Sequence, residues 1–196
     1  MSRFIDRGAV TAAWVGVGMA VTIAISLLLV IPIEPFYWLL ALPSGLLIGY
    51  YANQRSDRRR GPWSRILANA LVAGLATGLT MAVLLLAVKA LFFFGDNGYR
   101  PTELGGPLTC TGGADCVYAR YKEEPDNAKD LAAAGITDTA AFTSFYWRQQ
   151  LTSAATVFVL TVIGGLGGGV LYGTFRPRTG SGQTTAASRA EVGGGT

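Results

Sequence analysis

Residues 161–173 read TVIGGLGGGVLYG, and this stretch decides the fold of the chain. Six glycines in thirteen residues are typical of a loop that cradles phosphate. The stretch holds neither a G-x-G-x-x-G nor a G-x4-G-K motif, however, and no strand pattern precedes it. No charged residue occurs between Leu151 and Phe175. The stretch therefore predicts a membrane helix whose glycines let neighbouring helices approach closely.

Three further apolar runs cover much of the remaining chain. Residues 9–31 and 36–52 contain no charge, and residues 66–94 contain only Lys89. Charged residues make up 14% of the chain, whereas soluble domains have about 25%. Apolar runs of this length are needed to cross a hydrocarbon core of about 30 Å. In a helix the backbone N–H and C=O groups bond one another, so none is left without a partner in the lipid. The sequence predicts an all-α integral membrane protein with four transmembrane helices, at 9–31, 36–52, 66–94 and 151–175.

The segments outside these spans differ in length and character. We expect a cytoplasmic N-terminus (1–8), an outer turn (32–35), a basic cytoplasmic loop (53–65), an extracytoplasmic segment with short helices (95–150) and a disordered cytoplasmic tail (176–196). The first run follows two arginines, as a signal peptide does. It is too long for a signal core and has no Ala-x-Ala site before Pro32, so it is expected to remain as a helix.

Basic residues gather on one side of the predicted membrane. The N-terminus, the 53–65 loop and the tail carry ten basic and three acidic residues; the other side carries five basic and nine acidic ones. The positive-inside rule then places both termini and the 53–65 loop in the cytoplasm. Aromatic clusters at 36–38, 92–94 and 145–147 are expected at the outer interface. The alanine, glycine and arginine usage favours a bacterial plasma membrane protein.

The basic loop allows two interpretations. In the first, its arginines act only as a topology signal. In the second, they also bind anionic lipid head groups, and each arginine contributes about 1 kcal/mol to that binding. No aromatic stacking platform accompanies them, which argues against a nucleic-acid partner. The expected partners are the lipid bilayer and other membrane subunits or a second copy of the chain. The arginines are Arg55, Arg58, Arg59, Arg60 and Arg65.

Small residues recur at intervals of four on the last two predicted spans. This spacing places them on one helix face, where missing side chains let two backbones approach closely. We expect the third and fourth spans to pack face to face, with contact to another subunit as the alternative. A shorter set, Gly45 and Gly49, lies on the second span beside a kink expected at Pro43. The small residues are Gly164, Gly165, Gly168, Gly169 and Gly173 on the fourth span, and Ala70, Gly74, Gly78 and Ala82 on the third.

The two cysteines, Cys110 and Cys116, both lie in the 95–150 segment, on the expected oxidising side. Five residues separate them, whereas redox motifs usually have two, and zinc sites need further Cys or His ligands. We therefore expect a structural disulfide and no metal. Residues 125–135 predict a short helix that Asp126 or Asn127 caps and Gly135 ends, and Thr137 or Asp138 is expected to cap the following helix.

The predicted spans lack the side chains that membrane catalysis and transport usually require. They contain no Asp, Glu or His, and Lys89 lies close enough to the outer end for its ammonium group to reach the interface. The whole chain has no histidine, which excludes imidazole ligation of haem and histidine general bases. We expect no catalytic residue and no cofactor.

The predicted plan resembles that of the tetraspanins, with cytoplasmic termini, a short first outer loop and a longer second loop that carries a disulfide. The Cys-Cys-Gly signature of that family is absent from this chain. The resemblance concerns topology alone and assigns no site residue.

These features favour a non-enzymatic four-helix membrane protein that serves as an accessory, scaffolding or assembly subunit. Its outer segment and glycine faces would be presented to partners. Two other classes stay open. A small transporter or pore-forming subunit would open at Pro43 and the glycine cluster, and a thiol-redox membrane enzyme would use Cys110 and Cys116.

Overall fold

The computed structural model describes residues 6–30, 34–56, 61–95 and 112–175. Every secondary-structure element within these ranges is a helix, which confirms the all-α prediction for this part of the chain. In chain order the elements are α1 (Arg7–Ala24), the π-helical segment η1 (Ile25–Val30), α2 (Glu34–Gln54), α3 (Trp63–Gly95), α4 (Ala114–Glu123), α5 (Pro125–Ala133) and α6 (Thr139–Thr174).

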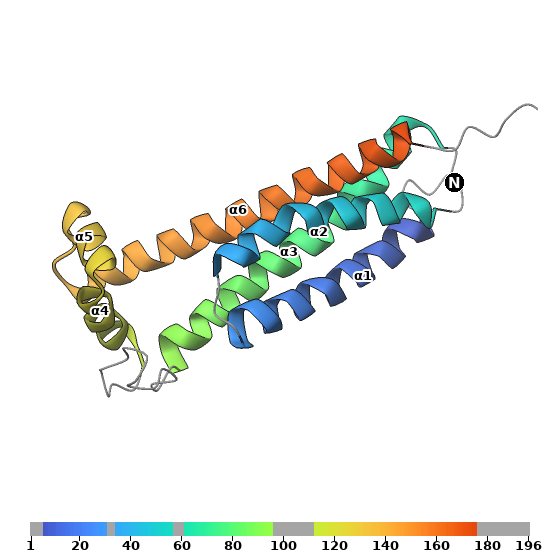
Figure 1. Ribbon diagram of the computed structural model, residues 1–196. Coiled ribbons are helices and arrows are strands. Elements are labelled where there is room, and N and C mark those ends of the chain that lie inside the picture. Colours follow the sequence, from blue (N-terminus) through green and yellow to red (C-terminus); the bar gives the residue numbers. More distant parts are fainter. Residues whose placement is uncertain (1–5, 31–33, 57–60, 96–111, 176–196) are drawn as a thin grey trace, which may run out of the picture.

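The long helices of the described residues, α1, α2, α3 and α6, form an elongated bundle (Figure 1). The chain runs along α1, returns along α2, runs out again along α3 and returns along α6, so the start of α1 and the end of α6 lie at the same end. The short helices α4 and α5 lie at the opposite end, beside the start of α6. We call α4 and α5 the platform, and we name the two ends of the bundle the platform end and the terminal end.

Three of the long helices could cross a membrane by length and composition. They are α1 together with the start of η1 (Arg7–Leu28), α3, and α6. Helix α2 is not among them, because prolines, tyrosines and small residues dilute its apolar content. The structure therefore supports membrane localisation and three of the four predicted spans. Large apolar side chains are nevertheless exposed along all four helices, and those of α2 include Phe36, Leu39, Leu42 and Leu47.

Two clusters of buried apolar residues fill the bundle, and they differ in side-chain size. The cluster nearer the platform contains large side chains, among them Tyr37, Met81 and Leu85. The cluster nearer the terminal end is built mostly from alanines of three different helices, namely Ala12, Ala52 and Ala73, with Ile48. Small side chains let helix backbones approach closely, and alanines contribute to the cluster nearer the platform as well.

Helix α6 begins well before the predicted span 151–175 and runs without a break from the platform into the bundle. Asp138 caps it, since its carboxylate accepts a hydrogen bond of 2.8 Å from the Ala141 N–H. This is one of the two capping residues expected from the sequence. Helix α2 likewise continues through Pro43, which is exposed, as far as Gln54.

The platform differs from the sequence prediction in two places. Helix α5 begins at Pro125, a residue suited to a first helical turn, rather than after a cap at Asp126 or Asn127. Gly135 follows its end with a φ of 67°, a conformation that glycine adopts without strain. Helix α4 was not predicted, because the turn-rich residues before Gly113 conceal where the helical pattern starts.

Candidate functional site

The glycine face of α6 lies against two helices at once. Gly164 and Gly168 face α2: a Cβ atom at Gly168 would come within 2.7 Å of the Tyr50 backbone nitrogen. At Gly164 it would come within 3.0 Å of the Leu46 backbone nitrogen. Backbone atoms cannot change rotamer as side chains do, so a side chain at either position would require the two helices to move apart.

Gly165 and Gly169 face α3, in the arrangement that the spacing of small residues predicts. A Cβ atom at Gly165 would lie 3.0 Å from the Gly74 Cα atom, and one at Gly169 would lie 2.7 Å from the Ala70 Cβ atom. Gly78 continues this contact, because a Cβ there would lie 3.1 Å from the Phe158 carbonyl oxygen. Ala82 is also buried. Gly173 lies against the indole ring of Trp63.

The contact between α2 and α6 is more extensive than the sequence indicates. A Cβ atom at Gly49 would lie 2.8 Å from the Gly165 Cα atom, and one at Gly45 would lie 2.9 Å from the Gly165 nitrogen. Gly165 therefore lies between α2 and α3. In contrast, Gly167 on the same helix has no atom within 4 Å of where its Cβ would be. The glycines at 164, 165, 168 and 169 thus contact other helices of the same chain.

Polar side chains in the bundle interior bond backbone carbonyls. The hydroxyl groups of Thr77 and Thr161 donate to the carbonyls four residues earlier, at 2.9 and 2.8 Å. Two longer-range bonds join helices. The Tyr37 hydroxyl of α2 donates to the Met81 carbonyl of α3 at 2.7 Å. The Asn53 amide donates to the Ile66 carbonyl at 3.1 Å and to the Gly49 carbonyl of its own helix at 3.0 Å.

A polar cluster closes the terminal end. The Asp6 carboxylate accepts a hydrogen bond from the Ser56 hydroxyl, and the Asp6 N–H donates to the Asn69 side-chain oxygen at 3.4 Å. Of the five arginines in the predicted basic loop, Arg58, Arg59 and Arg60 lie outside the described residues. The other two lie within them: the exposed Arg55 donates from Nε to the Tyr51 hydroxyl at 3.1 Å, and Arg65 lies half-buried near the start of α3.

Aromatic side chains fasten the platform to the bundle. Phe93 of α3 and Phe142 and Tyr146 of α6 form a buried cluster with Leu131 of α5. The Tyr121 ring of α4 lies against Phe142, with 5.2 Å between the ring centroids. The Gly113 N–H, at the start of α4, donates to the Phe93 carbonyl at 2.8 Å. The sequence clusters 92–94 and 145–147, which we expected to form an interfacial belt, therefore also build the support of the platform.

Cys116 lies on α4 and is 5% exposed. Cys110 lies outside the described residues, so the disulfide between them stays a prediction. The described residues contain no group of three or more His, Cys, Asp or Glu side chains that could hold a metal ion.

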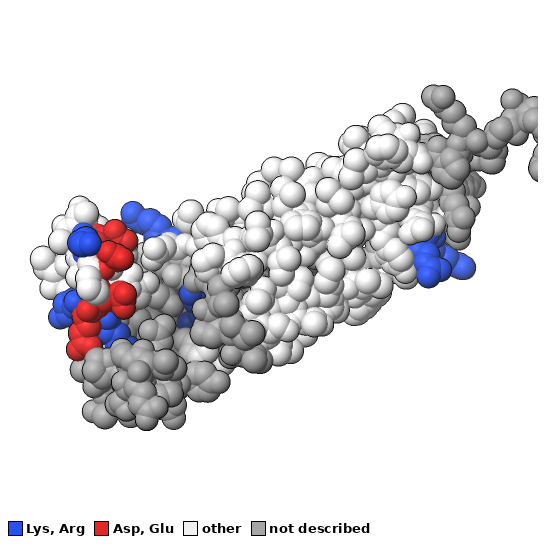
Figure 2. All heavy atoms as spheres, viewed as in Figure 1, with Lys and Arg blue, Asp and Glu red and all other residues white. Residues whose placement is uncertain are grey.

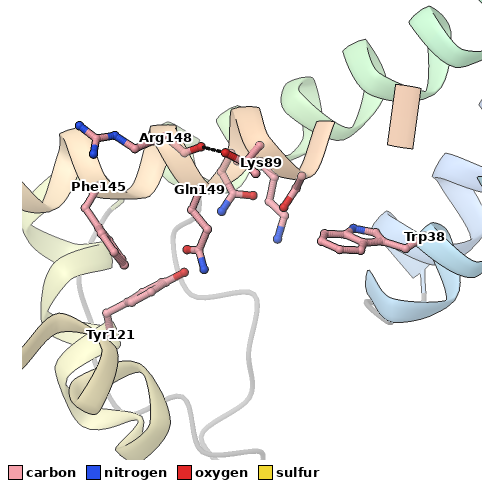
Figure 3. A pocket seen from close by; sticks show the side chains of 9 residues that line it. Trp38, Lys89, Tyr121, Phe145, Arg148 and Gln149 are labelled. Atoms are coloured by element: carbon pink, nitrogen blue, oxygen red, sulfur yellow. Dashed lines mark hydrogen bonds between the residues drawn. The ribbon is translucent and has the colours of Figure 1, made fainter. Parts of the chain in front are cut away.

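A hollow of about 470 Å³ opens where the platform meets the bundle. Trp38 and Lys89 lie on one side, Tyr121 and Phe145 lie on the other, and Gln149 projects between them (Figure 3). Four helices contribute: α2, α3, α4 and α6. The remaining lining residues come from α6 and are Arg148, Gln150, Thr152 and Ser153.

Gln150 is the unusual residue of this hollow. Its side chain is almost wholly buried, at 4% exposure, and its Oε1 atom has no hydrogen-bond partner within the described part of the chain. Buried polar atoms nearly always have a partner, and one without a partner calls for an explanation. Sequence reasoning missed this site, because its residues come from four separate segments and only Lys89 stands out among apolar neighbours.

The comparisons identify no relative of this chain. No family model, no curated protein and no solved structure matches it. The arguments for function therefore come from the geometry described above.

Proposed function

We propose that the chain is a non-enzymatic four-helix membrane protein that acts as an accessory, scaffolding or assembly subunit of a membrane complex. The observation that carries this proposal is where the charged groups lie. Figure 2 shows an uncharged surface along the bundle, with acidic and basic side chains gathered on the platform and further basic ones near the terminal end. The interior is filled by apolar side chains and by glycine backbones in contact. A closed bundle with a charged, projecting platform suits docking better than conduction.

In this proposal α2 is the fourth transmembrane helix. Its 21 residues would span about 30 Å, which matches a hydrocarbon core. It packs against α1, α3 and α6 along the bundle. Its outward-facing leucines and Phe36 would otherwise be exposed to water. The low hydropathy of α2 then reflects the glycines and tyrosines that it uses for contact with its neighbours.

The charge distribution supports one orientation in the membrane. We place the terminal end, with both chain termini and the 53–65 loop, in the bacterial cytoplasm, and the platform outside. Arg55 and Arg65 would then lie at the cytoplasmic head groups and contribute to binding of anionic lipid there. A disulfide between Cys110 and Cys116 would restrain the start of α4 on the oxidising side.

The platform is the surface that we expect to meet a partner. Exposed residues of both signs cover α4 and α5, and Lys129 and Asp126 form an exposed ion pair of 2.9 Å there. Such pairs add little to stability, whereas charges at the rim of an interface select partners and orient them. A membrane subunit with an extracytoplasmic part of mixed charge is the kind of partner that fits.

Affinity purification of the full-length protein from native membranes in a mild detergent tests the proposal. We expect another membrane subunit, or a second copy, to copurify in a fixed ratio. Reversing charges on the platform, with Lys122→Glu and Lys129→Glu together, should release the partner. The control variant Gly167→Ala, whose site faces no neighbour, should retain it.

Other outcomes would favour the alternative classes. A protein that purifies only as a monomer and supports solute flux in liposomes would be a transporter or pore-forming subunit. Turnover of a dithiol with a quinone, lost in Cys116→Ser, would indicate a thiol-redox enzyme.

A further inference from the structure

The hollow at the platform end combines charges, a buried acceptor and aromatic rings at one place. We propose that it binds the head group of a phospholipid that carries both a phosphate and a hydroxyl group. This inference is independent of the docking role of the platform, because it concerns the interior of the junction rather than its charged surface.

Lys89 of α3 lines the hollow with its ammonium group directed into it, whereas the guanidinium group of Arg148 extends away along α6 (Figure 3). Lys89 lies six residues before the end of α3 at Gly95, which places its backbone about 9 Å inside that end. Its long side chain carries the charge toward the hollow while its stem stays among apolar neighbours. Arginine and lysine are the residues that bind phosphate oxygens by charge-assisted hydrogen bonds. The Lys89 ammonium group in the hollow therefore favours an anion.

Gln150 adds a feature that a phosphate diester alone does not match. Its Oε1 atom is a buried acceptor without a partner among the described residues, and a ligand with a donor would supply one. The phosphate diester of a lipid has acceptor oxygens only. A hydroxyl group on the alcohol that esterifies this phosphate would supply the donor. A glycerol head group combines the two functions in one small molecule.

The size and surroundings of the hollow favour a lipid over a soluble phosphate ester. A volume of about 470 Å³ accepts a head group but not a whole lipid, so acyl chains would have to lie outside it. Leu39 follows Trp38, and Leu151 follows Gln150, and these leucines are 67% and 56% exposed. They offer apolar surface next to the hollow. Tryptophan is also the residue that membrane proteins place at the head-group level.

A bound lipid would connect the platform to the bundle. Tyr121 belongs to α4, whereas Trp38 and Lys89 belong to α2 and α3, and all three line the same space. A ligand that contacts all three would hold the platform against the membrane-embedded helices.

The experiment uses the full-length protein in a neutral detergent and measures lipid binding by native mass spectrometry. The probes are dioctanoyl phosphatidylglycerol, dioctanoyl phosphatidylcholine, which lacks the hydroxyl donor, and soluble glycerol 3-phosphate. We expect phosphatidylglycerol to bind about tenfold more tightly than phosphatidylcholine, the change that leaving the buried Gln150 acceptor unpaired produces, and more tightly than glycerol 3-phosphate, which has no acyl chains.

Variants locate the binding. Lys89→Gln and Gln150→Leu should each weaken phosphatidylglycerol binding by about tenfold, and Lys89→Arg should retain most of it. Lys129→Gln removes a charge on α5, away from the hollow, and should bind as the unmodified protein does. If Lys89→Gln does not fold, Gln150→Leu and Lys89→Arg still decide the outcome. Unchanged binding in Gln150→Leu and Lys89→Gln would overturn the site, and equal binding of glycerol 3-phosphate would overturn the lipid assignment.

Discussion

Gly49 of α2 and Gly165 of α6 lie in backbone contact, so that a Cβ atom on Gly49 would come within 2.8 Å of the Gly165 Cα atom. On its other side Gly165 lies against Gly74 of α3, and a Cβ atom on Gly165 would lie 3.0 Å from the Gly74 Cα atom. One residue without a side chain therefore brings three helices together. In lipid, helix association depends on such close packing, because burial of leucine gains little there.

Substitution by alanine, which adds one methyl group, should distinguish the glycines of α6 that contact a neighbouring helix from those that do not. Gly168→Ala places its Cβ 2.7 Å from the Tyr50 nitrogen, so we expect it to destabilise the bundle by about 1–3 kcal/mol. Gly167→Ala meets no atom within 4 Å and should change stability by less than about 0.5 kcal/mol. Unfolding in mixed micelles of increasing denaturing detergent measures both. Equal stability of the two variants would contradict the packing role.

Larger substitutions on the face toward α3 should act in the same direction. The double variant Gly165→Leu with Gly169→Leu should lower the temperature at which monodisperse protein is lost, far more than Leu171→Ala does. Leu160 of the same helix packs partly against the core, so it is unsuitable as a second lipid-facing control. Val159 is 50% exposed and replaces it. If Val159→Ala with Leu171→Ala lowered this temperature more than Gly165→Leu with Gly169→Leu, the glycine face would not be a helix interface.

The hydrogen bond between the Tyr37 hydroxyl and the Met81 carbonyl should stabilise the pairing of α2 with α3. Tyr37→Phe removes only the donor, and we expect a loss of about 0.5–1.5 kcal/mol in the free energy of unfolding. Tyr50→Phe, on the more exposed Tyr50 of the same helix, is the matched control and should have little effect. The detergent titration used for the glycine variants compares the two. A loss in Tyr50→Phe as large as in Tyr37→Phe would argue against this bond.

The orientation proposal predicts which positions an impermeant thiol reagent can reach. In a Cys110→Ser, Cys116→Ser background, Gln54→Cys at the end of α2 should react only after the membrane is permeabilised. Glu123→Cys, exposed at the end of α4, should react in intact cells. The reverse pattern would invert the sidedness of the whole molecule, and reaction of both in intact cells would show that α3, the long helix between the two positions, does not span.

The predicted disulfide has a simple chemical test. Denatured protein purified without reductant should take up no alkylating reagent at Cys110 or Cys116, and reductant should expose both. On a chain-entropy estimate, closing so short a loop stabilises the fold by about 2 kcal/mol. We expect reduction to loosen the platform, seen as faster hydrogen exchange in α4, while the glycine contacts in the bundle stay protected. Alkylation of both cysteines before reduction would refute the bond.

The amino-acid sequence by itself determined the long helices of the bundle and the face that α6 turns toward α3. Runs such as 66–94 must be helical, because lipid offers no partner for backbone polar groups. The four-residue spacing from Gly165 to Gly169 and from Ala70 to Gly74 marks matching faces, because a helix brings residues four apart onto one side. These are local properties of the chain, and they can be read from one segment at a time.

Only the tertiary structure decided how α2 fits, where the platform lies and which residues form the hollow. In the sequence, Gly45 and Gly49 are a weaker signal of helix packing than the small residues of α3. The structure shows that they contact α6, because a helix contact depends on the partner surface as much as on spacing. Gln150 gives no signal in the sequence. Its importance comes from burial beside Lys89 and Trp38, residues that are far apart in the chain and that meet only when four helices pack around one space.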